Sequence, residues 1–324
     1  MKFSTLLWIA RWSLVIAGVG LSATAVLAEN TEPSFEPRFI DVNGIRTRYY
    51  DIGKGEVIVL VHGSGFRGSA SADLWAPVFP YLSKNFRVVA ADKLAAGGTD
   101  NPKDDKDLNI HGEIRHTFEF IQAMKLDKIH LVGQSRGAGL ALFLAHQNPS
   151  LVKTLTLVNS NTAAPVYGYD DLRRARALAA CGKAGSFEYY ICTIRTFSYT
   201  PDNVTPNFVA ITKALDETQK SVDSKRRKAA LGSDEVEFSE WKAGVLEQIR
   251  QRGLLKMPIL LYWGQNDPTA VLEQGISLFD VLGINNPNVR LMVINQAGHF
   301  PFREYPAEFS HDLESFIKKQ QTAQ

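Results

Sequence analysis

A serine between two glycines is the first feature of the chain that indicates chemistry. Residues 133–137 read Gly-Gln-Ser-Arg-Gly, and they follow an apolar run and precede a helical pattern. A strand, a G-x-S-x-G turn and a helix in this order form a nucleophile elbow, which holds the serine in a strained conformation with its hydroxyl exposed. Small residues two before and two after the serine avoid clashes in so sharp a reversal. The sequence therefore predicts that Ser135 is a nucleophile.

A serine hydroxyl is a poor nucleophile at neutral pH and needs an adjacent base. After such an elbow, the chain order is an acid and then a histidine. His299 lies in a short glycine-containing loop after the last apolar run, and we expect it to be the base. Asp267 is the only carboxylate in the turn after residues 259–263, and we expect it to accept the imidazole N–H. Asp92 ends an earlier run and is the next-best acid, but it precedes Ser135.

The other six histidines have simpler interpretations. His130 lies inside an apolar run and is expected in the core, and His62 is placed to hold the turn after its run. The remaining four fall on helical patterns and are expected at the surface: His111, His116, His146 and His311.

Attack on a carbonyl creates negative charge, which fixed hydrogen-bond donors must stabilise. One expected donor of this oxyanion hole is the backbone N–H of Arg136, directly after the nucleophile. The other lies in the His-Gly-Ser-Gly loop 62–65, where glycines let the backbone approach a substrate closely, and we assign it to Ser64. The residues expected to bind substrate are Gly63, Gly65, Gln134 and Phe300.

The elements that must position these residues alternate between strands and helices. Nearly unbroken β-branched runs occupy residues 56–61, 86–91, 129–132, 155–158, 259–263 and 289–294. Two further strands, 38–42 and 46–51, flank an Asn-Gly pair that predicts a tight hairpin. Helical patterns lie between the runs, for example at 110–124, 138–146 and 307–317. We therefore predict an α/β fold, with a mostly parallel eight-stranded sheet flanked by helices.

The alternation stops between about residues 164 and 253, a mainly helical stretch without a convincing strand. We interpret this stretch as a helical cap inserted into the core domain. The core then consists of residues 36–163 and 254–320.

The first 28 residues differ from the rest of the chain. Lys2 and Arg11 supply positive charge, and residues 14–28 carry none. Small residues precede Glu29 at the positions that a signal peptidase reads. This pattern predicts a signal peptide cut after Ala28 and export to the periplasm or the medium, with an uncleaved anchor as the alternative.

The chain has only two cysteines, Cys181 and Cys192. Export would place them in an oxidising compartment, where pairing is possible. One straight helix cannot hold both ends of that bridge, but Gly182 and Gly185 could bend the chain back on itself. The sequence leaves a disulfide and two buried thiols equally open.

The composition excludes several classes of partner. The formal net charge of +2 provides no basic field for nucleic acid, and there is no CxxC motif or His/Cys cluster to suggest a metal. We expect no metal or other cofactor, a small-molecule substrate as a partner, and no nucleic acid. No later segment is apolar for long enough to cross a bilayer, so cleavage of the signal would leave no stable membrane anchor. The oligomeric state stays open.

Four motifs together resemble the α/β-hydrolase superfamily, in its serine-nucleophile branch, over residues 36–320. They are segments 62–65, 133–137, 263–267 and 298–301. The first is similar to the corresponding loop of the meta-cleavage product hydrolases, which split a carbon–carbon bond in vinylogous 1,5-diketones, and of related esterases. The resemblance implies that Gln134 stands where that group usually has Asn. It also implies a cap arginine that holds the substrate carboxylate, to be chosen from Arg173, Arg174, Arg176 and Arg195.

These observations predict a serine hydrolase that acts on a small carbonyl substrate, namely an ester, a lactone or a β-diketone-like carbon–carbon bond. The expected route runs through a Ser-His-Asp triad and either an acyl-enzyme or a gem-diol. The alternative is a non-hydrolytic protein of the same fold: a lyase, a cofactor-free oxygenase or a ligand-binding protein.

Overall fold

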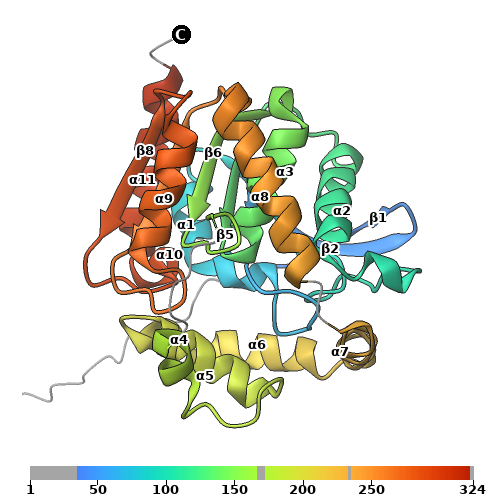
Figure 1. Cartoon of the computed structure of the whole chain (residues 1–324). Coiled ribbons are helices and arrows are strands. Elements are labelled where there is room, and N and C mark those ends of the chain that lie inside the picture. The colour runs from blue at the N-terminus through green and yellow to red at the C-terminus, as the bar shows by residue number, and fades with distance from the viewer. Residues whose placement is uncertain (1–34, 166–171, 233–234, 322–324) are drawn as a thin grey trace, which may run out of the picture. The chain divides into compact units, whose positions relative to one another are not determined.

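The computed structural model describes residues 35–165, 172–232 and 235–321 (Figure 1). The predicted signal peptide lies outside these residues. The described part contains one eight-stranded sheet with the order β1-β2-β4-β3-β5-β6-β7-β8. The strands are β1 (Arg38–Val42), β2 (Ile45–Gly53), β3 (Val57–Val61), β4 (Arg87–Ala91), β5 (Ile129–Gln134), β6 (Val152–Val158), β7 (Ile259–Gly264) and β8 (Val289–Ile294). Strand β2 pairs antiparallel with β1 and β4, and all other pairs are parallel, which confirms the predicted sheet.

The apolar runs form central strands because both faces of the sheet are covered. Successive side chains of a strand point to opposite faces. In β3, Val59 and Val61 belong to one buried cluster, whereas Ile58 and Leu60 belong to the other. A central strand therefore needs an apolar residue at every position, and the sequence supplies one.

Helices cover both faces of the sheet. One face is covered by α2 (Ile110–Ala123), α3 (Arg136–Gln147), α8 (Glu235–Arg252) and α9 (Leu272–Gly283). The other is covered by α1 (Phe79–Leu82), α10 (Pro301–Glu304), α11 (Pro306–Gln321) and the 3₁₀ helix Ala72–Val78. Shorter 3₁₀ turns occur at Asp105–Asp107, Pro149–Leu151 and Pro201–Asn203. Among the described helices, none is long and apolar enough to span a bilayer.

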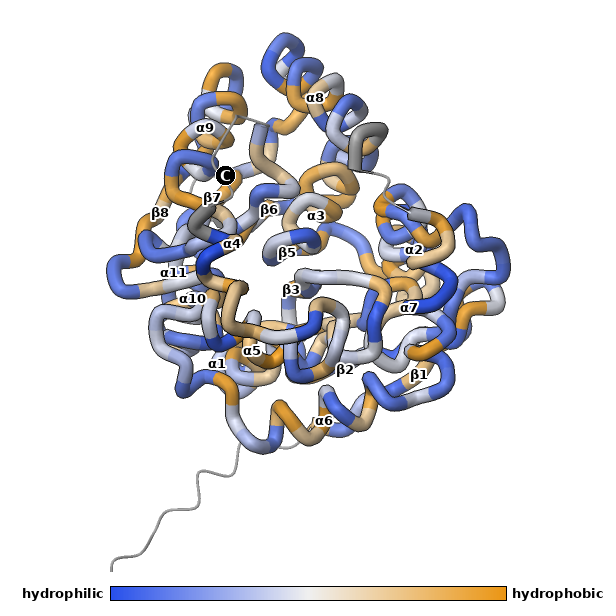
Figure 2. Tube along the Cα trace, turned by 60° about the horizontal axis from the view of Figure 1, so that its bottom comes forward, coloured by the Kyte–Doolittle hydropathy of each residue, from blue (hydrophilic) through white to orange (hydrophobic). Residues whose placement is uncertain are grey.

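Four helices lie beyond the carboxyl ends of the central strands (Figures 1 and 2). They are α4 (Leu172–Leu178), α5 (Phe187–Phe197), α6 (Pro206–Asp216) and α7 (Gln219–Leu231). Helix α7 is tied to the core because Ser224 Oγ donates to the carbonyl oxygens of Phe66 and Ala95, at 3.1 and 3.0 Å. We refer to helices α4–α7 as the cap.

The position of helix α8 differs from the prediction. Residues 164–253 were expected to form the cap, but α8 packs on the sheet face beside α3 (Figure 1). Its side chains Val245, Leu246 and Ile249 are buried in the same cluster as the β7 residue Ile259. The apolar side of α8 thus returns the chain to the core before β7 begins.

Cys181 and Cys192 form a disulfide, with their Cα atoms 5.4 Å apart. Cys181 follows α4 and Cys192 lies within α5, so the bridge joins two elements rather than two turns of one helix. Gly182 and Gly185 reverse the chain between them with φ angles of 78° and 88°. Of the two states that the sequence left open, the structure contains the disulfide.

Two local predictions have different outcomes. Asn43 and Gly44 both have positive φ, 53° and 84°, and close the β1–β2 hairpin as predicted. The expectation that His116 is a surface residue is wrong. His116 lies on the inner side of α2, where its Nε2 is 3.0 Å from the hydroxyl of Thr47, and the ring is buried.

Candidate functional site

Ser135 occupies a tight turn between β5, which ends at Gln134, and α3, which begins at Arg136. Its φ of 52° is strained for a residue with a Cβ, and its N–H donates to the carbonyl oxygen of Val158 at 2.9 Å. A Cβ on Gly137 would lie 2.3 Å from the Val61 oxygen, and one on Gly133 would lie 2.3 Å from the Gly137 oxygen. The predicted sharp turn with obligatory small neighbours is confirmed.

His299 and Asp267 are in direct contact. Nδ1 of His299 lies 2.6 Å from Oδ2 of Asp267, and both side chains are buried. The other carboxylate oxygen accepts the N–H groups of Thr269 and Ala270, at 2.7 and 2.9 Å. Because an ionised carboxylate can only accept, the hydrogen must sit on Nδ1, which leaves Nε2 of His299 as the basic nitrogen.

Asn159 is a site residue that the sequence analysis missed. Its Nδ2 donates to Oδ2 of Asp267 at 2.6 Å, and its Oδ1 accepts the N–H of Gly264 at 3.0 Å. The residue directly follows β6 and has a φ of 41°. A buried polar residue at the carboxyl end of a central strand was the available signal.

The cap holds the loop that carries His299. The N–H of His299 donates to the carbonyl oxygen of Phe197, the last residue of α5, at 2.7 Å. Glu304 joins the same two segments: one carboxylate oxygen accepts the N–H of Gly298 at 2.9 Å, and the other accepts those of Tyr199 and Thr200, at 2.8 and 2.9 Å. Burial raises the pKa of Glu304 above its usual value. Glu304 carries no motif that marks it as a site residue in the sequence.

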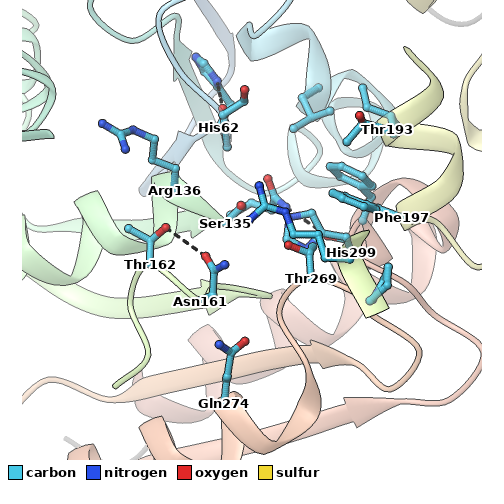
Figure 3. A pocket seen from close by; sticks show the side chains of 18 of the residues that line it. His62, Ser135, Arg136, Asn161, Thr162, Thr193, Phe197, Thr269, Gln274 and His299 are labelled. Atoms are coloured by element: carbon cyan, nitrogen blue, oxygen red, sulfur yellow. Dashed lines mark hydrogen bonds between the residues drawn. The ribbon is translucent and has the colours of Figure 1, made fainter. Parts of the chain in front are cut away.

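Ser135 and His299 line one cavity of about 630 Å³ between the core and the cap. Figure 3 shows both side chains at this cavity, with Phe197 of the cap beside His299. Of the other predicted site residues, the cavity is lined by Gly63, Ser64, Gln134, Arg136 and Phe300. Gly65 is not a lining residue, because it lies against the side chains of Glu113 and Arg136.

The loop 62–65 is held from behind by His62. Nε2 of His62 accepts the N–H of Lys93 at 3.1 Å, so Nδ1 carries the hydrogen and donates to the Gly63 carbonyl oxygen at 2.8 Å. Burial lowers the pKa of His62 well below its usual value, which keeps the ring neutral. The expectation that His62 holds its turn is confirmed.

Asp92, the alternative acid, has partners away from His299. Its oxygens accept two bonds from Nη1 of Arg48, at 3.3 and 3.1 Å, and the N–H groups of Ala72 and Gly98, at 2.6 and 2.7 Å. Asp92 is fully buried with these partners. It anchors the segments around β4 and does not contact the imidazole.

The described lining residues include four cations and no carboxylate: Arg67, Arg136, Arg174 and Lys242. Of the four cap arginines considered from the sequence, Arg174 lines the cavity, Arg176 and Arg195 do not, and the side chain of Arg173 lies outside the described part. Burial lowers the pKa of Lys242 to about 8. The cavity therefore favours a negatively charged ligand. Within the described ranges, no group of three or more His, Cys, Asp or Glu could hold a metal ion.

Known hydrolases resemble this chain over most of its length. The chain is 26% identical over 312 residues to a 2-hydroxy-6-oxo-6-(2'-aminophenyl)hexa-2,4-dienoic acid hydrolase of Metapseudomonas resinovorans, covering 92% of this chain and 97% of that protein. It is 26% identical to a 2-hydroxymuconate semialdehyde hydrolase of a Pseudomonas species, covering 88% of this chain and 95% of the relative. These two names confirm the resemblance to the meta-cleavage product hydrolases.

The solved structures extend the likeness to the fold. A meta-cleavage product hydrolase from Pseudomonas fluorescens superimposes with a TM-score of 0.70 at 23% identity, over 87% of this chain and 97% of that one. The sequence model of the alpha/beta hydrolase fold matches residues 56–306, which include the elbow, Asp267 and His299. The chain therefore belongs to the alpha/beta hydrolase fold family and is a hydrolase.

Proposed function

We propose that the chain is a serine hydrolase in which Ser135 is the nucleophile, His299 the general base and Asp267 the acid that orients it. The observation that carries the proposal is the shared cavity: Ser135 and His299 both line it, and Asp267 fixes the tautomer that leaves Nε2 of His299 basic. The N–H groups of Ser64 and Arg136 are the proposed oxyanion donors. Neither donates to another group among the described residues.

The proposed reaction begins when Nε2 of His299 takes the hydroxyl proton of Ser135 and the oxygen attacks the substrate carbonyl carbon. The carbonyl oxygen becomes an oxyanion that accepts the two backbone N–H groups. The bond to the leaving group then breaks, and the leaving group takes the proton from His299. Water, deprotonated by His299, adds to the acyl group, releases a carboxylic acid and restores Ser135. In the gem-diol variant, water attacks the carbonyl directly.

We propose a substrate that carries a carboxylate in addition to the scissile carbonyl. Four cations and no described carboxylate line the cavity, and although Arg136 is paired with Glu113 behind it, the excess of positive charge favours an anion. Nη2 of Arg136 and Nε of Arg67 are buried without a partner in the described part, and a carboxylate would provide one. Together with the names of the relatives, this favours a carbon–carbon bond in a 2-hydroxy-6-oxo-dienoate, whose conjugation stabilises the leaving carbanion.

The test compares two substrates on the purified mature chain: 2-hydroxy-6-oxo-6-phenylhexa-2,4-dienoate and p-nitrophenyl acetate. We expect kcat/KM to be higher for the dienoate by a factor of 100 or more, and Ser135→Ala to remove both activities and labelling by a fluorophosphonate. If kcat/KM is instead higher for the ester by a factor of 100 or more, the substrate is an ester and not a carbon–carbon bond. Equal labelling of wild type and Ser135→Ala would show that the labelled nucleophile is a residue other than Ser135 and would overturn the proposed triad.

We also propose that the chain is exported, with its signal cut after Ala28. The disulfide supports this proposal, because such bridges persist in oxidising compartments. N-terminal sequencing of the mature protein should begin at Glu29. A mature protein that keeps residues 1–28 and is recovered from the cytoplasm would contradict the proposal.

A further inference from the structure

Three charged side chains lie behind the proposed oxyanion donors. Nζ of Lys93 donates to the carbonyl oxygen of Ser64 and to Oε1 of Glu113, the latter at 3.0 Å. Nε of Arg136 donates to Oε2 of Glu113 at 2.6 Å. The side chains of Lys93 and Glu113 are only 2% and 0% exposed. Through Lys93, the Glu113 carboxylate thus links the loop after β3 to the first residue of α3.

These contacts fix the orientation of two consecutive peptide groups. His62 holds the carbonyl oxygen of Gly63, and Lys93 holds that of Ser64. In a trans peptide the N–H points opposite to the C=O, so the N–H groups of Ser64 and Gly65 point away from these partners. Ser64 has a φ of 53°, which a residue with a Cβ keeps only when its surroundings hold it. Lys93 holds the loop twice, because its own N–H also bonds to His62.

The loop packs directly on the carboxylate. A Cβ added to Gly65 would lie 2.9 Å from Oε1 of Glu113 and 3.3 Å from Nε of Arg136. The glycine predicted to bind substrate therefore has another role, which is to bring the loop against this cluster.

The cluster carries two cations and one anion, and so a net positive charge beside the proposed oxyanion. The groups that face Lys93 are Glu113 from α2, Arg136 from α3, and the Ser64 carbonyl and neutral His62 from the loop. Burial lowers the pKa of Lys93 to about 8, against the opposing effect of Glu113, so the ammonium is retained at pH 7. Charge in a buried site acts strongly on a nearby developing anion.

We propose that Lys93, Glu113 and Arg136 are positioning residues that hold the two backbone donors of the oxyanion hole at a fixed separation and place a positive charge behind them. The inference rests on the proposed function, because it concerns the oxyanion that Ser135 would generate. No side chain of the network needs to touch the scissile bond. With a substrate that lacks a carboxylate, the effect of the network is expected in the transition state and not in substrate binding.

The test uses p-nitrophenyl acetate, so it does not depend on the physiological substrate. Lys93→Met and Glu113→Gln should each lower kcat by about 10- to 50-fold, with KM within threefold, because one donor of an oxyanion hole is worth 10²–10³ in rate and these residues act indirectly. Lys93→Arg keeps a cationic donor, so its kcat should fall less than that of Lys93→Met. The matched control is Lys220→Met: Lys220 is also a largely buried lysine whose Nζ donates to loop carbonyls, those of Ala96 and Gly97. It should stay within twofold of wild type.

A second measurement separates positioning from general loosening of the fold. A trifluoromethyl ketone forms a tetrahedral oxyanion on serine, whereas the matching methyl ketone binds mainly as the ground state. Lys93→Met should weaken inhibition by the trifluoromethyl ketone at least tenfold and that by the methyl ketone less than twofold. Equal weakening of both, or an unchanged kcat, would overturn the inference.

Failure of the proposed function has a different signature. Wild type that neither hydrolyses the ester nor reacts with a fluorophosphonate at Ser135 would overturn that function, and this inference with it. If Lys93→Met does not fold because Glu113 loses its ammonium partner, the double variant Lys93→Met/Glu113→Gln removes both charges. That variant should fold, and its kcat should still be tenfold lower than that of wild type. A double variant with the kcat of wild type would overturn the inference.

Discussion

The backbone N–H of His299 donates to the carbonyl oxygen of Phe197, so the main chain of the proposed base is hydrogen-bonded to the last residue of the cap helix α5. The rings of these two residues also meet edge to face, with centroids 6.0 Å apart. The cap therefore positions the imidazole as well as enclosing the cavity.

Glu304→Gln tests this coupling. The carboxylate accepts three backbone N–H groups from the His299 loop and from the chain after α5, and an amide cannot accept all three. We expect kcat to fall by about tenfold, because small misplacements of reacting groups are costly. The control is Glu308→Gln, an exposed glutamate on α11, which should leave kcat unchanged. An active Glu304→Gln enzyme would show that the Phe197 contact alone suffices.

Gly63→Ala should damage the nucleophile by steric contact. The new Cβ would lie 2.3 Å from Oε1 of Gln134 and 3.0 Å from Cβ of Ser135. We expect kcat/KM to fall by about 100-fold or more. In the matched control, Gly244→Ala on α8, the added methyl meets no atom within 4 Å. That variant should keep full activity and gain up to about 1 kcal/mol of unfolding free energy, because glycine disfavours a helix interior. Equal activity of the two variants would contradict the steric argument.

Asn159→Asp should disable the acid by placing a second carboxylate beside it. The substitution replaces the amide that donates to Asp267 at 2.6 Å with an acceptor of like charge. We expect a loss of about 100-fold in kcat, and a loss of about 1–3 kcal/mol in the free energy of unfolding measured with urea. Asn295→Asp, at an exposed position, is the control for charge alone. If kcat and the free energy of unfolding fall equally little in both variants, Asn159 does not support Asp267.

Three buried histidines should make the fold sensitive to acid. Burial lowers the pKa of His116 to about 4, and it also lowers those of His62 and His130. Below pH 6.5 the unfolded chain binds protons that these rings do not, so stability is present above that pH and is lost as the pH falls. Each ring should remove up to about 1.4 kcal/mol per pH unit.

Urea unfolding between pH 7.5 and 5 measures this slope. His116→Gln, which keeps a polar side chain next to Thr47, should lower the slope by about one third. A slope that His116→Gln leaves unchanged would mean that other groups cause the acid sensitivity.

The sequence predicts the sheet well because a central strand covered on both faces requires unbroken apolar runs, as in β3. The elbow is equally predictable, because the sharp turn restricts residues 133 and 137 to glycine. The position of α8 is not, because helical periodicity reveals an apolar side but not the surface on which it packs. Asn159 and Glu304 escaped notice because their partners are backbone groups or distant side chains, which only the folded chain brings near. His116 was misplaced for the same reason.

The main-chain bond between residues 197 and 299 constrains how the substrate range of this enzyme can be altered. Side-chain substitutions along α5 leave the Phe197 carbonyl in place. Substrate specificity can therefore be changed by substitutions there without displacing His299. A chimera that replaces the cap with that of another protein must instead provide a carbonyl oxygen that can accept the N–H of His299. A graft shorter by a single residue would rotate the acceptor away and release the imidazole, even if every pocket side chain were matched.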